Sequence, residues 1–433
     1  MALWPSLPAE LRLEIFELLA QDRLAHFHFG SYAVVSHEWL AFFEPKNFRR
    51  LSLRLPCLDD LDRMVNIRQR EFVEHIRLDI GVERYNCQSC GTGKSESCAA
   101  INSDVARRAI LKLFSILSTW EPNRGGRGLK LEISAYSPKD SQLLGPKHGW
   151  LDGHDISTSW SLETTLPEVQ AVTKFVIHPH CRRHFCASYL GLLLDKLPRL
   201  ECLVYEPWYP LLYDSGYKTL IEAHLPKGLR ALTVFELDPD HLVFEYPDPG
   251  HLKFLRRLMA GRAPVQDATA LGAAFACRSL ELEHLDVTFN VDAEQFFDAR
   301  EPLWTWDNLR SLVLTSQLLT PMAEPLEING MLENAAAAAL CMPKLETMYV
   351  WNGAKREACA FVYYQTYETG HPTIIWRGTW NHGFVPRVIQ AWEGVASKRN
   401  RSKLRLQTQY LDPDDVDSRA MSMLDLPCGV VRW

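Results

Sequence analysis

The stretch at residues 197–205, Leu-Pro-Arg-Leu-Glu-Cys-Leu-Val-Tyr, returns at residues 342–350 as Met-Pro-Lys-Leu-Glu-Thr-Met-Tyr-Val. In both, an apolar residue is followed by another three positions later and by a third two positions after that. An alternating apolar pattern of this kind predicts a short strand with one buried face. The lead-in of an apolar residue, a proline and a basic residue is also present at residues 225–227. The recurrence indicates that a repeated unit decides the fold.

The apolar pattern occurs eight times, and residues 129–133 carry a looser ninth copy. Where copies are dense they begin 28 and 29 residues apart, at Val172, Leu200 and Leu229. The eight copies begin at Phe48, Val73, Val172, Leu200, Leu229, Leu282, Leu309 and Leu345. Between copies, composition and periodicity predict helices at residues 104–120, 185–197, 269–277 and 332–341.

A Leu-x-x-Leu-x-apolar core at this period resembles the leucine-rich repeat. The resemblance implies an α/β fold, an irregular solenoid in which short strands alternate with helices and each unit is buried against its neighbours. The repeat's usual Asn or Cys, three residues beyond the strand core, is present only as Asn290. The hydrogen bonds of the loops must therefore be met in another way. The alternative is an α/β domain whose strands begin similarly by chance.

The region from Trp376 onward departs from the repeat. Residues 386–396 predict a helix with Val388, Ile389, Trp392 and Val395 facing inward, and residues 403–408 predict a strand. Terminal repeats are often atypical because they cover an exposed core. We interpret this region as a C-terminal cap.

The N-terminal segment, residues 7–45, carries two helical patterns. In the first, Pro8 suits the opening turn, Glu10, Glu14 and Glu17 share one side, and Leu7, Leu11, Ile15, Leu18 and Leu19 share the other. In the second, Pro45 is a plausible stop, and one side holds Tyr32, Val35, Trp39 and Phe42 or Phe43. Two helices of this length are not expected to enclose a core of their own.

Three groups of residues in this segment resemble the F-box, the adaptor-binding module of SCF ubiquitin ligases. They are Leu7-Pro8-x-Glu10-Leu11, Ile15 with Leu18-Leu19, and Val35-Ser36-x-x-Trp39. The segment departs from the family at residues 20–24, where Ala-Gln-Asp-Arg-Leu replaces the usual acidic-Pro turn, and this leaves the length of the second helix open. The alternative is an N-terminal helical hairpin packed on the body of the protein.

The F-box resemblance implies a non-catalytic substrate receptor. Residues 1–45 would dock on a Skp-type adaptor and, through it, on a cullin, while a repeat domain at residues 46–433 would hold a target protein. The residues expected to contact the adaptor are Leu7, Pro8, Leu11, Ile15, Leu18 and Leu19, with Val35 and Trp39 fixing the second helix. Two alternatives remain open: a scaffold that binds partners without ubiquitination, and an enzyme with an unrecognised site on the repeat face.

Composition argues against several classes of protein. Of the 433 residues, 47 are basic and 53 acidic, so a net charge of −6 does not favour nucleic-acid binding. The sequence shows neither a bilayer-spanning apolar run nor a signal peptide, and the odd number of cysteines, 11, suits reduced thiols. We therefore expect a cytoplasmic or nuclear protein. The basic residues of 398–405 fit either a nuclear-import patch or a cationic helix end.

Sequence motifs for chemistry are weak. Cys87-x-x-Cys90, with Cys98 nearby, makes one half of a zinc site, and the remaining ligands would have to come from His178, His180, Cys181, His184 and Cys186. A second Cys pair at a standard interval is missing. Residues 91–95 end like a phosphate-binding loop, but Gln88 stands where that loop needs glycine. We predict no catalytic residues, no metal and no cofactor.

Overall fold

The computed structural model of the chain describes most of its residues, and everything below refers to them: 4–21, 29–81, 96–122, 128–136, 166–178, 185–206, 216–235, 267–354, 356–365, 371–400, 403–414, 416, 424 and 426. They form a mixed α/β structure around one twelve-stranded sheet, whose strands lie side by side in the order of the sequence. The sheet is parallel from β1 to β9, antiparallel through β10 and β11, and parallel again between β11 and β12.

Nine of the twelve strands coincide with the nine copies of the apolar pattern, so the predicted strands are confirmed. They are β1 (Arg50–Leu53), β2 (His75–Gly81), β3 (Leu129–Tyr136), β4 (Val172–Ile177), β5 (Cys202–Tyr205), β6 (Ala231–Phe235), β7 (His284–Asp292), β8 (Ser311–Thr315) and β9 (Thr347–Ala354). The remaining strands are β10 (Glu357–Tyr364), β11 (Thr373–Gly378) and β12 (Arg405–Tyr410).

The second apolar residue of each copy occupies the same register position across nine strands. Leu51 pairs with Ile76, Ile76 with Leu131, and the row continues through Phe175, Leu203, Leu232, Leu285, Leu312 and Met348. Because side chains alternate between the two faces of a strand, the whole row lies on one face. This row explains why the pattern recurs: each copy supplies one rung of a continuous apolar ladder.

Main-chain hydrogen bonds also link successive units where their strands begin. The N–H groups of both Arg230 and Ala231 donate to the carbonyl of Glu201, and those of Glu283 and His284 donate to the carbonyl of Arg230. The carbonyls of Glu283 and Arg310 likewise each accept two hydrogen bonds from the next unit. Main-chain hydrogen bonds therefore join successive units at the start of their strands.

Asn290 itself lies beside an irregular step in β7. Its Nδ2 donates to the carbonyls of Val234 and Thr288, and the pairing of β7 with β8 shifts register between Val287 and Asp292. Phe289 adopts a φ of 60°, in the left-handed region, and its N–H donates to Thr315 Oγ1 at 2.8 Å. A bulge of this kind bends a strand locally.

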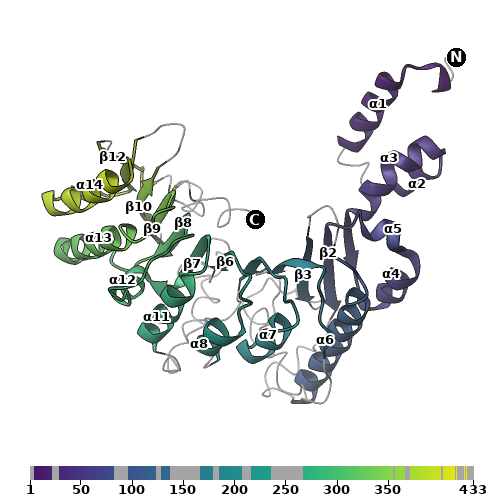
Figure 1. The fold of residues 1–433 in the computed structure, drawn as a ribbon, viewed down its shortest axis with the longest axis horizontal. Coiled ribbons are helices and arrows are strands. Elements are labelled where there is room, and N and C mark those ends of the chain that lie inside the picture. The colour runs from purple at the N-terminus through teal and green to yellow at the C-terminus, as the bar shows by residue number, and fades with distance from the viewer. Residues whose placement is uncertain are drawn as a thin grey trace.

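The helices of the repeats line one face of the sheet, as Figure 1 shows, and the strands form an arch inside them. The four predicted helices are confirmed as α6 (Glu96–Leu117), α7 (Ala187–Leu194), α11 (Ala268–Ser279) and α13 (Pro325–Ala339). Shorter helices are η3 (Leu55–Cys57), α4 (Leu58–Met64), α5 (Ile67–Arg70), α8 (Tyr217–Thr219), η6 (Leu220–His224) and α12 (Ala293–Asp298). In the part of the chain that the structure describes, none of the helices combines the length and apolar character needed to cross a bilayer.

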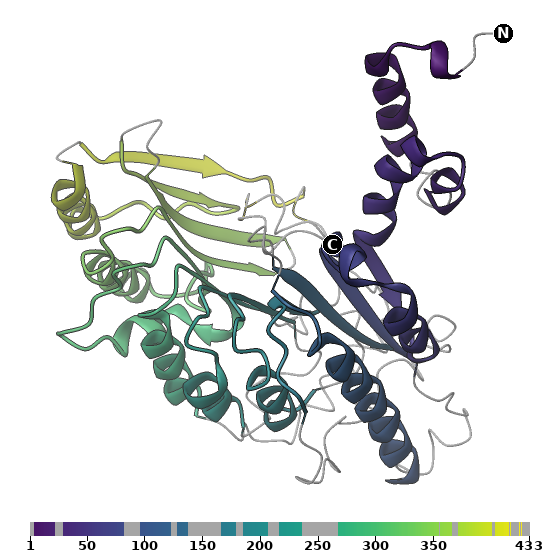
Figure 2. The same cartoon turned by 45° about the vertical axis from the view of Figure 1, so that its right-hand side comes forward.

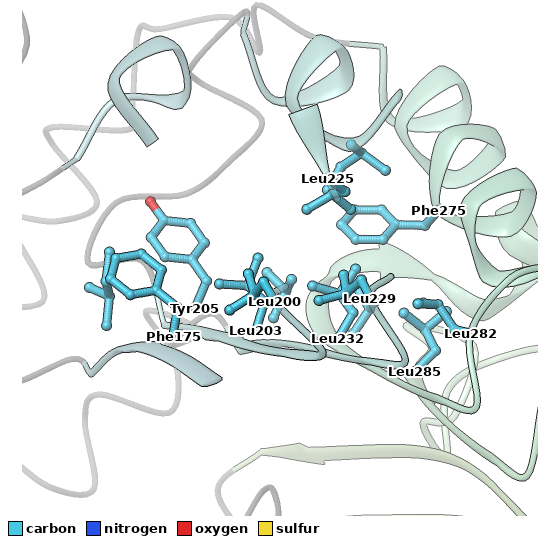
Figure 3. Close-up of a cluster of buried hydrophobic side chains, with 14 of the residues drawn as sticks. Phe175, Leu200, Leu203, Tyr205, Leu225, Leu229, Leu232, Phe275, Leu282 and Leu285 are labelled. Atoms are coloured by element: carbon cyan, nitrogen blue, oxygen red, sulfur yellow. The ribbon is translucent and has the colours of Figure 1, made fainter. Parts of the chain in front are cut away.

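The main hydrophobic core lies between this row of helices and the sheet. In Figure 3 the ladder residues Phe175, Leu203, Leu232 and Leu285 lie in a row along the strands, on the side from which Phe275 of α11 reaches the core. All of these side chains are almost fully buried. The core runs without interruption from β1 to α14, so the units are held together by apolar contacts with their neighbours.

The C-terminal region extends the sheet. The predicted helix is α14 (Pro386–Asn400), with Val388, Trp392 and Val395 buried as expected, whereas Ile389 is only half-buried. Strands β10 and β11 were not predicted, and β12 occupies the predicted strand at residues 403–408 but forms the outer edge of the sheet. The described residues of this region therefore leave a sheet edge at β12.

The described N-terminal segment begins with the short helix η1 (Trp4–Ser6). Three α-helices follow it: α1 (Ala9–Gln21), α2 (Phe29–Ala33) and α3 (His37–Phe48). The prediction that Pro45 ends the second helix is wrong, because Pro45 lies inside α3 and the predicted domain boundary after residue 45 falls within this helix. Val35 is not on that helix either; it lies in the turn before the N-cap Ser36. Figure 2 shows these helices projecting from one end of the sheet.

Candidate functional site: the N-terminal helices and the second face of the sheet

The N-terminal helices have a small core of their own, contrary to the expectation that they could not enclose one. Phe16 of α1 is 3% exposed and packs against Trp39, Phe42 and Phe43 of α3, with ring centroids 4.9 to 5.6 Å apart. Phe29 of α2 completes the buried set. This cluster is separate from the main core. An aromatic third helix makes the difference, because rings bury large areas over few residues.

Phe16 determines which side of α1 faces α3. At about 100° per residue, Leu11 lies about 140° around the helix from Phe16, while Leu18 lies only about 20° from Leu11. Leu11 and Leu18 are accordingly 46% and 61% exposed. Two further members of the predicted arc, Leu7 and Ile15, are half-buried. A leucine-rich side of α1 is thus left at the surface.

The other residues expected at the adaptor contact occupy different settings. Pro8 is exposed before the start of α1, and Leu19 is half-buried at the edge of the aromatic cluster. Val35 is 59% exposed in the turn between α2 and α3. Trp39, in contrast, belongs to the cluster, where its ring lies 5.0 Å from that of Phe16. Trp39 therefore packs between the helices, whereas Val35, which was expected to fix the second helix together with it, lies at the surface outside α3.

A polar joint connects α3 to the sheet. Glu44 is almost buried, and its two carboxylate oxygens accept hydrogen bonds from Arg68 Nη2 at 2.6 Å and Gln69 Nε2 at 3.1 Å. Only Arg49 separates α3 from β1, and its Nε lies 2.7 Å from Glu74 Oε2. The direction of α3 relative to the first strands is therefore fixed by contacts on both sides of the junction.

The face of the sheet opposite the helices is called the second face here, and it carries the residues that alternate with the apolar ladder. From β2 to β5 these residues are mostly polar or charged. They include His75, Arg77, Asp79, Lys130, Glu132, Lys174 and Cys202, with His178 just after β4 and Glu206 just after β5. The repeat pattern fixes their position but not their type, because the ladder constrains only the alternate residues.

Glu132 is the centre of this polar region. Its carboxylate accepts a hydrogen bond from His75 Nε2 at 3.0 Å and lies 3.2 Å from Lys130 Nζ and 3.6 Å from Arg77 Nη1. Burial raises the pKa of a carboxyl group, but the hydrogen bond from His75 and the nearby charges of Lys130 and His178 outweigh it and lower the pKa of Glu132 to about 2. Glu132 is therefore an anion that holds several basic side chains together.

The polar network continues to Glu206. The ring of His178 reaches both carboxylates, with Nδ1 3.0 Å from Glu206 Oε2 and Nε2 3.9 Å from Glu132 Oε2. Further along, Asp286 accepts a hydrogen bond from Thr288 Oγ1 at 3.0 Å. Burial, with a smaller contribution from the charge of Glu206, raises the pKa of Asp286 to about 7. The second face therefore combines an anchored anion with a carboxyl group that titrates near neutrality.

From β8 to β11 the second face is apolar and covered. Trp351, Val362 and Ile375 pack there with three positions near the C-terminal end: Val416, Leu424 and Leu426. Arg377 Nη1 donates to the carbonyl of Leu424, which ties that position to β11. The chain itself thus shields the apolar half of this face, while the polar half holds the half-exposed side chains of Arg77, Lys130 and His178.

The candidate metal ligands can be placed only in part. Cys87, Cys90, His180, Cys181 and His184, and the side chain of Cys98, lie outside the described residues. His178 is engaged with the two carboxylates, and Cys186 Sγ lies 3.0 Å from Ser188 Oγ. Among the residues that the structure describes, no group of His, Cys, Asp and Glu is arranged to hold a metal ion.

A comparison with known protein families matches the later part of the chain. Residues 224–432 match a family of unknown function, DUF6546. This segment begins at the end of η6 and includes β6 to β12, so it spans the later repeats and the C-terminal extension. The comparison with curated proteins finds no match.

Sequence reasoning missed the roles of Phe16 and of the polar residues around Glu132. Phe16 lies outside the leucine-rich arc, and the aromatic residues of α3 were a signal for its role, because aromatic rings pack favourably against one another. The polar network joins His75, Glu132 and Glu206, which are far apart in the sequence, with His178 between the two carboxylates. Their proximity follows only once the strand copies are placed side by side in register.

Proposed function

We propose that this protein is the substrate-recognition subunit of an SCF-type cullin ubiquitin ligase. The N-terminal helices would act as an F-box that docks on a Skp-type adaptor, and the remainder, as an irregular leucine-rich-repeat solenoid, would hold the target protein. The protein itself would perform no covalent chemistry. Its function would be to bring a target within reach of a ubiquitin-conjugating enzyme.

The observation that carries this proposal is the exposed leucine-rich side of α1. An ordinary hairpin packed on the body would bury these leucines against the sheet or its helices, but α1 buries Phe16 instead and leaves Leu11 and Leu18 at the surface. Exposed apolar side chains grouped on one helix side are characteristic of a partner contact. The helices also project from the sheet in Figure 2, which leaves room for an adaptor.

The regular ladder supports the solenoid half of the proposal. Nine strands in sequence order, each contributing one residue to a shared apolar row, are what stacked repeats produce. The row of helices on one side gives each unit a strand and a connecting segment. The second face would then be the natural place for a target, and its polar region around Glu132 offers charged groups that fix orientation.

Adaptor capture by paired variants of α1 tests the proposal. Leu11→Asp combined with Leu18→Asp places charge in the proposed contact, which costs several kcal/mol when buried and should reduce adaptor binding by at least about 100-fold. Leu13→Asp is the matched control, since Leu13 is 49% exposed but lies about 160° from Leu11 around α1. The purified intact protein and the control should bind a Skp-type adaptor equally, and the double variant should not.

Two results would refute the proposal. Wild-type protein that fails to bind any Skp-type adaptor would remove its basis, and binding that survives in the double variant would place the contact elsewhere. Thermal unfolding of the variants checks that the helices remain folded. A scaffold that does not ubiquitinate its partners would keep adaptor binding, but silencing its gene would leave the amounts of its bound targets unchanged.

A further inference from the structure

Strand β12 is an edge strand without a described neighbour on its outer side. It is last in the sheet order, and Figure 2 shows it as the outermost arrow. All six of its residues, Arg405 to Tyr410, are exposed. Its pairing with β11 is nevertheless complete, from Arg405 opposite Thr373 to Tyr410 opposite Gly378. It is therefore a well-formed strand with one side left open among the described residues.

The hydrogen bonds to β11 identify which backbone groups face outward. The N–H of Arg405 donates to the carbonyl of Pro372, and the N–H of Leu411 donates to the carbonyl of Gly378. Backbone groups alternate in direction along a strand, so the N–H and C=O groups of Leu406, Thr408 and Tyr410 point away from β11. These three residues present the hydrogen-bonding row that a further strand would need.

Among the residues that the structure describes, nothing protects this edge against pairing in the usual ways. Natural edge strands are blunted by proline, inward charge, bulges or very short length. In β12 there is no proline, the register with β11 has no shift, and the only charged side chain is that of Arg405. The strand at the other end of the sheet, β1, has four residues. The longer β12 is thus the edge that is equipped to accept a strand.

We propose that β12 pairs with β12 of a second copy of this chain, in an antiparallel register with the two-fold axis at Thr408. In this register the outward-facing Thr408 lies opposite its own counterpart, and Leu406 lies opposite Tyr410 of the partner. In an antiparallel pair, two opposed residues exchange hydrogen bonds when the N–H and C=O groups of both face the partner strand, and this register supplies three such pairs. Leucine beside an aromatic ring is a favourable cross-strand pair.

The charges at the two ends of β12 favour this antiparallel arrangement. Lys403 and Arg405 lie at its start, and Asp412 follows its end, together with Asp414, which pairs with Arg356 of the same chain. Antiparallel pairing places the basic end of one copy beside the acidic end of the other, on both sides of the axis, whereas parallel pairing of two copies would place like charges together. The contact also closes on itself, so it yields a dimer and not an open chain of molecules.

Mass measurement by light scattering during gel filtration tests the dimer on the intact protein. Wild type should have twice the chain mass of 49.6 kDa at micromolar concentration. Thr408→Pro removes an outward N–H without touching the bonds to β11 and should give monomer. Thr408→Ala keeps that N–H and should remain dimeric. Monomeric wild type, or assemblies that grow beyond two copies, would overturn the proposal.

Cysteine cross-linking tests the register independently of the proline variant. Directly opposed, hydrogen-bonded residues have Cα atoms about 5.5 Å apart, within disulfide range, so Thr408→Cys should form a covalent dimer on mild oxidation. Leu406→Cys is the matched control, because its counterpart would lie four residues away, about 14 Å. Wild type under the same oxidation gives the background from native cysteines. Equal cross-linking of both variants, or of neither, would contradict the register.

Discussion

Asp286→Asn is expected to raise the free energy of unfolding near and above neutral pH, where ionisation of Asp286 destabilises the wild-type protein. The pKa of Asp286 is raised from 3.8 to about 7 by burial, with a further contribution from Glu206. In the unfolded chain the carboxyl group releases its proton near its ordinary pKa, while in the folded protein it retains the proton until about pH 7. Folding is therefore opposed increasingly as pH rises through this window, and the full cost is present above it.

The size of the effect follows from the pKa shift. About three pKa units correspond to roughly 4 kcal/mol of unfolding free energy, with a slope of up to about 1.4 kcal/mol per pH unit inside the window. Asparagine has nearly the same shape and keeps an oxygen that can accept the hydrogen bond from Thr288 Oγ1. The variant should therefore match wild type near pH 4 and be more stable at pH 8.

Thermal unfolding of both proteins from pH 4 to pH 8 measures the difference. Asp307→Asn is the control, since Asp307 is an exposed acid, and its curve should follow that of wild type. The reasoning would be refuted by Asp286→Asn and wild-type curves that stay parallel across the range. It would equally be refuted if the variant were less stable at pH 8, because Asp286 would then be ionised and stabilising.

Three further changes have distinct expected results. Glu132→Gln should lower the free energy of unfolding at neutral pH by about 1 to 2 kcal/mol after allowance for solvent screening. The difference from wild type should disappear as pH falls from about 4.5 to about 2, because the wild-type carboxylate then becomes protonated, and unfolding measured across this pH range tests it. Phe16→Ala should cost the N-terminal helices about 3 to 5 kcal/mol, so limited proteolysis should cleave them while the sheet unfolds as before. Leu424→Ala should uncover the apolar part of the second face and increase binding of a hydrophobic dye, whereas the exposed-site variant Leu303→Ala should not.

The strands of the repeats were predictable because one physical requirement is repeated in each. Leu203, Leu232 and Leu285 must all reach the same core, and the sequence records this as a fixed spacing. Strands β10 and β11 were not predicted because both of their faces are buried. In β10, Cys359, Phe361 and Tyr363 belong to one cluster, and the alternating alanines and Val362 belong to the other. A continuous apolar run carries no alternation to detect.

The candidate site was predictable to a smaller extent. The leucines of α1 were identified from their helical spacing, but periodicity defines an arc and not the side on which a neighbouring helix packs. Phe16 decides that side through contacts with residues more than twenty positions away. For the same reason the pairing of His75 with Glu132, 57 residues apart, could not be read from either local sequence.

The contacts of Glu44 fix the orientation of α3 at the end that joins the sheet. A helix of twelve residues is about 18 Å long, and here its base is clamped by Arg68 and Gln69, so a small rotation at the joint would become a large displacement at the far end of α1. Under the proposed function, the fixed orientation of α3 would set the distance between the adaptor and the target. Only lysines in a limited band of the target's surface would come within reach, so the choice of modified lysine would be set by the length and angle of this arm as well as by the binding face.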